Sequence, residues 1–199
     1  EHARRLNPRG RGPAGDESAL DSAKAVAWMA YGIHGDELSS SDAAAVLAYY
    51  LVAGEDERAR SLRRDLVILI DPCENPDGRE RFLAQTTAFA HAVPSRDSED
   101  LSHTTVWPWG RGNHYLFDLN RDWLTLVHPE SRRVPVIASW NPQLMVDSHE
   151  MGSDDTYLFS PARRPFNPLK PAYLDAWADR FAAEAGVPAF YDYRDVLGM

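Results

Sequence analysis

The chain has 199 residues, enough for one domain with a hydrophobic core. Hydrophobic residues make up 44% of it and charged residues 26%, and the formal net charge of −9 argues against a surface that binds nucleic acid. The sequence contains no apolar stretch near the roughly 18 residues that a membrane helix needs. It also has a single cysteine, Cys73, which excludes an internal disulfide.

The first half of the chain predicts a strand, a helix and a second strand. Residues 1–24 are rich in Arg, Gly, Pro, Asp and Ser, and we expect a loop or a frayed end there. Residues 25–31 predict a buried strand. A helix follows over residues 43–52, with Ser41 as its N-cap and Gly54 at its end. Residues 55–64 carry mixed charge and are expected at the surface. Residues 66–70 predict the second strand, and a polar turn follows at residues 75–78.

The second half predicts a long loop and further strands and helices. Residues 94–114 contain Pro, Gly, Ser and Asp, and a loop of this length is usually functional. We expect a helix from Pro129 towards Trp140, a third strand over residues 143–146, a fourth over residues 156–160 and an amphipathic helix over residues 169–185. This alternation predicts an α/β fold, a three-layer α/β/α arrangement with a mixed, largely parallel central sheet.

Three potential metal ligands follow two of the predicted strands. His34 and Glu37 come after the first strand, and His149 comes after the third. In open α/β sheets, ligands bind beyond the carboxyl ends of the strands, so these side chains converge if the two strands are parallel neighbours. A catalytic zinc takes three such ligands and keeps a fourth position for water. Taken alone, the His-x-x-Glu pattern also fits a polar surface turn.

Four motifs in order resemble the zinc carboxypeptidase family of carboxypeptidase A-like enzymes, in a bacterial branch. The resemblance runs from about residue 25 to residue 160, so we expect residues 25–199 to form a partial catalytic domain of this kind. The motifs are His34-Gly35-Asp36-Glu37, Asn75-Pro76-Asp77-Gly78, Asp118-Leu119-Asn120-Arg121-Asp122-Trp123 and Asp147-Ser148-His149.

The resemblance implies a role for each matched residue. His34, Glu37 and His149 match the ligands of one Zn²⁺ per chain. Asn120 and Arg121 match the pair that binds the terminal carboxylate of a peptide substrate, a task that suits a planar guanidinium. Asp118 matches the carboxylate that orients a ligand histidine. For the arginine that polarises the scissile carbonyl we select Arg111, and a surface arginine is the alternative.

The family's general-base glutamate has no match in this chain. The chain begins at Glu1 and ends at Met199 without a terminating element, so we expect a fragment cut at both ends, inactive alone, with the glutamate downstream. The alternative is that Glu150 or Glu184 takes its place. The sequence leaves the preferred C-terminal side chain open.

Two other functions remain open at this stage. A zinc-dependent deacylase of N-acyl amino acids would use a similar set of residues, and a non-catalytic relative would bind peptides without cutting them. The resemblance favours a metallocarboxypeptidase whose partner is a peptide with a free C-terminal carboxylate. Secretion or a periplasmic location is our expectation, because bacterial relatives of this kind are often exported.

Overall fold

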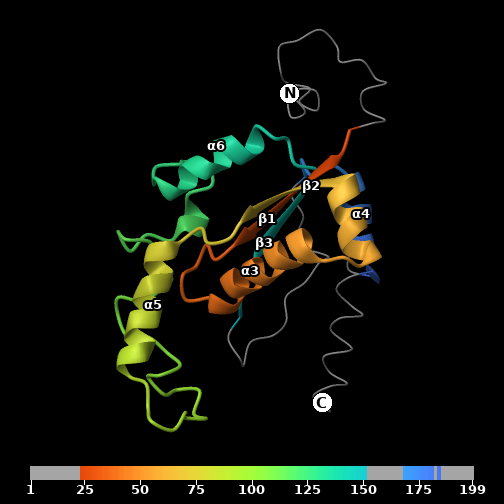
Figure 1. The fold of residues 1–199 in the computed structure, drawn as a ribbon. Helices are drawn as coiled ribbons and strands as arrows, with labels where there is room; N and C mark the ends of the chain where they lie inside the picture. Colours follow the sequence, from red (N-terminus) through yellow and green to blue (C-terminus); the bar gives the residue numbers. More distant parts are fainter. Residues whose placement is uncertain (1–22, 152–167, 182, 185–199) are drawn as a thin grey trace. The chain divides into compact units, whose positions relative to one another are not determined.

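The computed structural model describes residues 23–151, 168–181 and 183–184, which divide into two units between Met151 and Gly152. The second unit contains helix α7 (Tyr173–Phe181). The first unit contains, in chain order, β1 (Ala25–Tyr31), α3 (Leu38–Ala53), α4 (Glu57–Asp65), β2 (Leu66–Asp71), α5 (Pro76–Ala88), the 3₁₀ turns Leu119–Arg121 and Glu130–Arg132, α6 (Arg133–Ala138) and β3 (Leu144–Ser148) (Figure 1).

The three strands form a parallel sheet in the order β2-β1-β3. The central strand β1 is buried over most of its length, and Ala30 is fully enclosed. Ala30 pairs with Asp71 of β2 on one side and with Asp147 of β3 on the other. The carboxyl ends of all three strands therefore lie at one edge of the sheet, which is where the sequence predicted the metal ligands.

Helices lie on both sides of this sheet, so the predicted α/β fold is confirmed. Helix α3 packs on β1 and β2, and Figure 1 shows α3 and α6 on opposite sides of the strands. The predicted strands at residues 66–70 and 143–146 are present with slightly longer or shifted bounds. The long loop is also present, since residues 94–114 contain neither helix nor strand.

Some local predictions were wrong. Helix α3 begins at Leu38, so Ser41 lies inside the helix instead of capping it. The reason is a long-range contact, because the Glu150 carboxylate accepts the Ser39 N–H in the first turn. Gly54 does end the helix, and its N–H donates to the Tyr50 carbonyl.

The charged segment and the polar turn are both helical. Residues 57–65 form α4, in which Asp56 caps the first turn and only Ala59 is buried. The expected turn at residues 75–78 is the start of α5. Asn75 accepts the Gly78 N–H at 2.9 Å, and Pro76 occupies the first helical position, where a missing N–H costs nothing.

Two predicted helices are present with shorter bounds, and two other predictions lie mostly or wholly outside the described residues. The helix expected from Pro129 is a 3₁₀ turn that continues into α6, which ends at Ala138. The helix expected over residues 169–185 is observed as α7, over Tyr173–Phe181. The strand expected over residues 156–160, and nearly all of the expected N-terminal loop, lie outside the described residues. None of the described helices is both long enough and apolar enough to cross a membrane.

Three glycines bring separate segments into backbone contact beside the carboxyl edge of the sheet. A Cβ atom on Gly35 would lie 2.1 Å from the carbonyl carbon of Gly78. A Cβ atom on Gly78 would in turn lie 2.3 Å from the carbonyl oxygen of Gly110. Only glycine permits such close approach of backbone to backbone. The loop after β1, the start of α5 and the long loop are therefore locked against each other.

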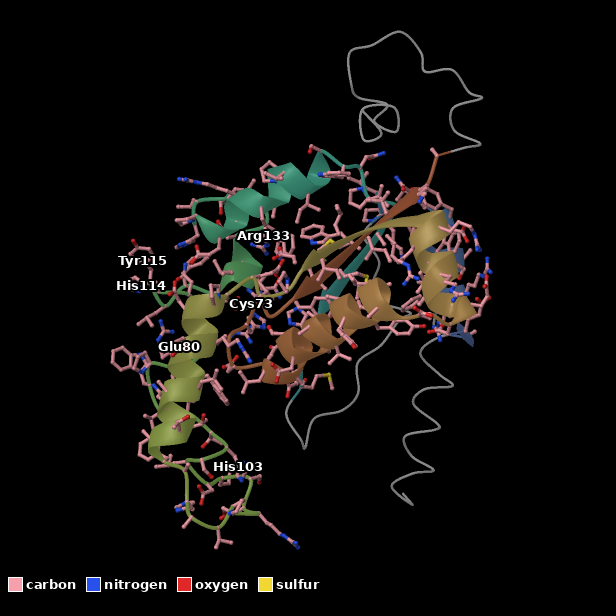
Figure 2. The ribbon with its side chains drawn as sticks, in the orientation of Figure 1. Cys73, Glu80, His103, His114, Tyr115 and Arg133 are labelled. Atoms are coloured by element: carbon pink, nitrogen blue, oxygen red, sulfur yellow. The ribbon has the colours of Figure 1, made fainter. Side chains whose placement is uncertain are left out.

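A buried acidic cluster lies where α6 meets the end of β2. Arg133, labelled in Figure 2, donates from Nε to Glu74 Oε1 at 2.7 Å and lies 3.0 Å from Asp71 Oδ2. The Glu74 side chain is fully buried. Burial raises the pKa of Glu74 to about 7, although the Arg133 charge acts in the opposite direction. Glu74 therefore keeps its proton to a higher pH in the folded protein than in the unfolded chain.

We expect the substitution Glu74→Gln to remove a pH-dependent part of the stability. A carboxyl whose pKa is raised on folding stabilises the fold fully below its ordinary pKa of 4.5 and loses that contribution as the pH rises through about 7. Relative to Glu74→Gln, the parent should lose free energy of unfolding across this window, as measured by urea denaturation. Glu80→Gln changes an exposed glutamate of α5 and is the control. Parallel pH curves for the parent and Glu74→Gln would contradict the prediction.

Candidate metal centre

His34 and Glu37 lie on the short loop between β1 and α3. The chain leaves β1 through Gly32, whose φ of 68° suits glycine. The Asn75 amide then donates to the Ile33 carbonyl at 3.2 Å, which fixes the backbone directly before His34. Because α3 begins at Leu38, Glu37 has little freedom to move. Both side chains are therefore held rigidly at the carboxyl end of β1.

His149 reaches the same place from the end of β3. Tyr31 pairs with Ser148 in the parallel register, so the next residue of each strand lies at the same edge. One ligand atom from each of His34, Glu37 and His149 lies within 4.8 Å of the other two. The structure thus brings together the three residues that the sequence singled out as metal ligands.

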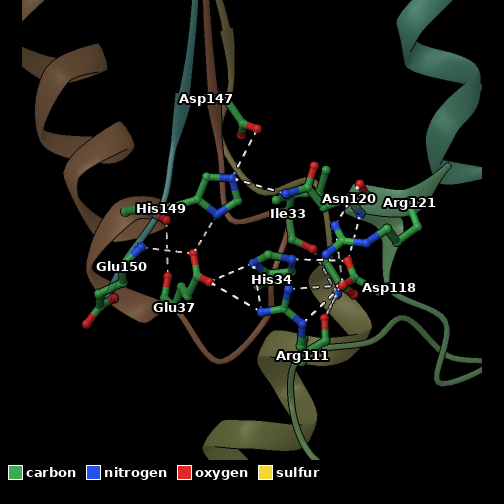
Figure 3. A network of polar contacts seen from close by, with 12 residues as sticks. Ile33, His34, Glu37, Arg111, Asp118, Asn120, Arg121, Asp147, His149 and Glu150 are labelled. Atoms are coloured by element: carbon green, nitrogen blue, oxygen red, sulfur yellow. Dashed lines mark hydrogen bonds and ion pairs between the residues drawn. The ribbon is translucent and has the colours of Figure 1, made fainter. Parts of the chain in front are cut away.

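The Glu37 carboxylate lies between the two imidazoles (Figure 3). Its Oε1 is 2.6 Å from Nδ1 of His34, and its Oε2 is 3.0 Å from Nδ1 of His149. The Glu150 N–H also donates to Oε2 at 2.9 Å. Burial acts to raise the pKa of Glu37, but the hydrogen bonds from His149, His34 and the Glu150 N–H outweigh it and lower the pKa to about 2. Glu37 is therefore ionised, as a metal ligand must be.

Each histidine uses its other ring nitrogen to contact a carboxylate. His34 Nε2 is 3.1 Å from Asp118 Oδ1, and His149 Nε2 is 3.1 Å from Asp147 Oδ2. Hydrogen bonds to Asp147 and Glu37 raise the pKa of His149 to about 10. A metal ion would have to displace this proton. Metal-binding histidines commonly pair with carboxylates in this way, which leaves the opposite nitrogen free to bind the ion.

The donor set fits zinc. Two imidazoles and one carboxylate are a common ligand set of catalytic zinc sites. Here both histidines direct Nδ1 towards Glu37, and both have Nε2 against an aspartate. The donor atoms and their arrangement are therefore compatible with the zinc ion that the sequence predicted at this position.

Arg111 extends over the same cluster from the long loop. Its Nε donates to Asp118 Oδ2 at 3.1 Å, and Nη2 lies 3.0 Å from the same oxygen. Its Nη1 is 3.4 Å from His34 Nδ1 and 4.0 Å from Glu37 Oε1. The Asn75 amide donates to the Arg111 carbonyl at 3.0 Å. Arg111 is thus adjacent to His34 and Glu37, although its side chain is 46% exposed.

Asn120 and Arg121 lie on the 3₁₀ turn that follows Asp118. The Asn120 amide nitrogen is 3.4 Å from His149 Nε2, and its oxygen accepts the Trp123 indole N–H at 2.8 Å. The Arg121 side chain is 66% exposed and donates to the Asn120 carbonyl at 3.2 Å. Its guanidinium is accessible to a ligand beside the cluster.

The two alternative general bases have other contacts. The Glu150 carboxylate accepts from both the N–H and the hydroxyl of Ser39, at 3.0 and 2.8 Å, and so stabilises the first turn of α3. Glu184, in the other unit, accepts from Arg180 at 2.7 Å. Glu150 is close to Glu37 and contacts it through its backbone N–H.

Two residues that the sequence indicated only as members of motifs support the site. Asp147 contacts His149, and Asn75 fixes the backbone at both Ile33 and Arg111. The Asp-x-His spacing at a strand end was a usable signal for Asp147. The two contacts of Asn75 depend on the close approach of three chain segments, which no local pattern reveals.

Comparison with known proteins assigns the chain to a family. No curated protein matches its sequence. Residues 12–156, most of the chain, match the family model described as zinc carboxypeptidase. The matched region includes each of the residues that converge at the carboxyl edge of the sheet. This protein belongs to the zinc carboxypeptidase family.

Proposed function

We propose that this chain carries the zinc-binding core of a metallocarboxypeptidase, which removes C-terminal amino acids from peptides. The observation that carries the proposal is the convergence of His34, Glu37 and His149, whose donor atoms lie within 4.8 Å of one another. Membership of the zinc carboxypeptidase family implies both zinc and peptide substrates.

In this proposal His34, Glu37 and His149 hold the zinc. Zinc supplies two effects at such a site, a lowered pKa of bound water and polarisation of the scissile carbonyl. Asp118 and Asp147 accept hydrogen bonds from the Nε2 atoms and keep each Nδ1 available as a ligand. Their charge also makes both imidazoles stronger donors to a cation.

Arg111 suits the stabilisation of negative charge on the scissile carbonyl. Its guanidinium lies 3.4 Å from His34 Nδ1, and this supports a role beside a carbonyl oxygen bound at the metal. Asp118 fixes two of its nitrogens in advance, which reduces the reorganisation needed during the reaction. We assign no general base among the described residues, because Ser39 already binds the Glu150 carboxylate.

Arg121 and Asn120 suit the recognition of the terminal carboxylate. A guanidinium can bind both oxygens of a carboxylate at once, and the Arg121 side chain is 66% exposed. A substrate held there has its last peptide bond near the metal ligands, since Asn120 also approaches His149. Cleavage would then occur next to the C-terminus.

The first test is the zinc content of the protein. After loading with zinc and dialysis, elemental analysis should give about one zinc per chain in the parent. His149→Ala should lose it, because a catalytic site then retains only two protein ligands. The matched control is His91→Ala, which removes an exposed histidine paired with Asp100. Loss of zinc in the control, or its full retention in His149→Ala, would argue against this metal site.

A second test concerns Asp118. We expect Asp118→Asn to weaken zinc binding about 10- to 100-fold, because His34 then loses the carboxylate that orients it. Competition with a chromophoric chelator gives the affinity. Asp65→Asn, on exposed α4, is the control and should match the parent. An unchanged affinity in Asp118→Asn would show that this carboxylate has no influence on the metal.

A third test concerns the terminal carboxylate. Zinc-loaded protein should bind a blocked peptide with a free C-terminus about ten-fold or more tightly than the same peptide with a C-terminal amide, as measured by calorimetry. Arg121→Ala should abolish the difference, whereas Arg60→Ala, an exposed arginine of α4, should preserve it. Equal binding of the two peptides by the parent would contradict the proposed specificity. Preferential binding of an N-acyl amino acid over the peptide would favour a deacylase.

A further inference from the structure

A recess beside Arg111 is not used by the chemistry described above. It has a volume of about 160 Å³ and opens to solvent. For comparison, an apolar protein cavity of about 150 Å³ can hold a benzene ring. Its walls are mostly apolar and come from the long loop and its continuation: Trp107, Pro108, Trp109, Arg111, Leu116 and Asp118.

The backbone of this loop is held in place by α5. The Gln85 amide donates to the Pro108 carbonyl at 3.0 Å. The Arg81 guanidinium donates to the carbonyls of Trp109 and Gly112, each at 3.1 Å, and to that of Asn113 at 2.8 Å. A ligand that enters this recess therefore does not have to order the loop first, which favours binding.

The indole rings of the loop remain exposed. Trp107 is 68% exposed and Trp109 is 57% exposed, although hydrogen bonds from α5 fix the carbonyls of Pro108 and Trp109. Large apolar side chains that are grouped and exposed on a soluble protein commonly mark a contact surface. Indole rings also bind other rings well, by stacking or by edge-to-face contact.

The recess is continuous with the metal centre and carries no net charge. Arg111 and Asp118 belong to its wall and also contact His34. The two charges pair with each other at 3.0 Å, so the wall favours a neutral occupant. Asn120 and Arg121 are not in this wall. The recess is built on the loop that carries Arg111, and it adjoins the residues proposed for the terminal carboxylate only through Asp118, which lies 4.0 Å from Arg121 Nη1.

We propose that this recess is a specificity subsite that receives an aromatic or large aliphatic side chain of the peptide substrate, on the amino-terminal side of the bond that is cut. The inference rests on the proposed function, since it assigns the recess to the same peptide that binds at the metal. It makes Trp107 and Trp109 specificity-determining residues.

The test uses zinc-loaded protein and peptides that cannot be cut. The reference is acetyl-Ala-Ala-Ala with a ketomethylene group in place of the last amide, and three analogues carry one Phe at each position. Calorimetry should show that Phe at the first or the second position improves binding by the parent about five-fold or more, as expected for the burial of one aromatic ring. No gain at either position would overturn the inference.

Variants then locate the effect. In Trp107→Ala/Trp109→Ala the gain, taken as the affinity for the Phe peptide divided by the same variant's affinity for the all-alanine peptide, should fall to less than about two-fold. Tyr49→Ala, which removes an exposed aromatic residue of α3, should keep the gain. A gain that survives in the double variant would overturn the assignment of the recess.

A measurement on the parent avoids any effect of the variants on folding. In nitrogen-15 spectra, the indole N–H signals of Trp107 and Trp109 should shift more on addition of the favoured Phe peptide than on addition of the all-alanine peptide. The indole signal of Trp140 is the control and should show no such difference between the two peptides. Equal shifts with the two peptides would count against the subsite.

If the all-alanine peptide binds and only the Phe gain is missing, the subsite alone is wrong. If the protein takes up no zinc or binds no peptide, the proposed function fails as well.

Discussion

The parallel pairing of β1 with both of its neighbours is the constraint on which the site depends. Because β1 is central, the chain leaves all three strands at the same edge, and residues more than a hundred positions apart meet there. The register sets Tyr31 beside Ser148, so His149 is next to the loop that carries His34. Burial of β1 on both faces stabilises this register, since a slip by one residue would move each closely packed side chain to the opposite face, into a space occupied by a side chain of different size.

The pairing also concentrates negative charge at one edge, and the structure compensates it locally. Glu37 lies between two histidines, Asp118 pairs with Arg111, and Asp71 and Glu74 share Arg133. Burial favours the protonated form of Glu74, which relieves part of the remaining repulsion. A cation bound between His34, Glu37 and His149 would replace the proton that His149 holds in its absence. Metal binding and protonation therefore compete for the same position.

The sequence predicted the large features because they depend on local patterns. Apolar runs located the three strands, and polar residues after them identified the edge where His34, Glu37 and His149 meet. It failed where long-range contacts decide the outcome. Ser41 is a sound local cap, but Glu150 binds the first turn of α3 and the helix starts earlier. The segment Asn75-Pro76-Asp77-Gly78 has the composition of a turn, yet the Asn75 side chain caps α5 and ties it to two other segments.

The contact between Gly35, Gly78 and Gly110 has a consequence for how such a site can diverge. No side chain fits at these three positions. The backbone of the loop after β1, which carries His34 and Glu37, therefore cannot be remodelled separately from that of the long loop at residues 94–114. Changes in loop length near Gly110 would be transmitted to His34 and Glu37. Exchange of Trp107 or Trp109 alters only exposed side chains on a fixed frame. If the recess is the proposed subsite, selection for a new substrate, in nature or in the laboratory, would therefore be expected to act first on those two side chains and to leave His34, Glu37 and His149 undisturbed.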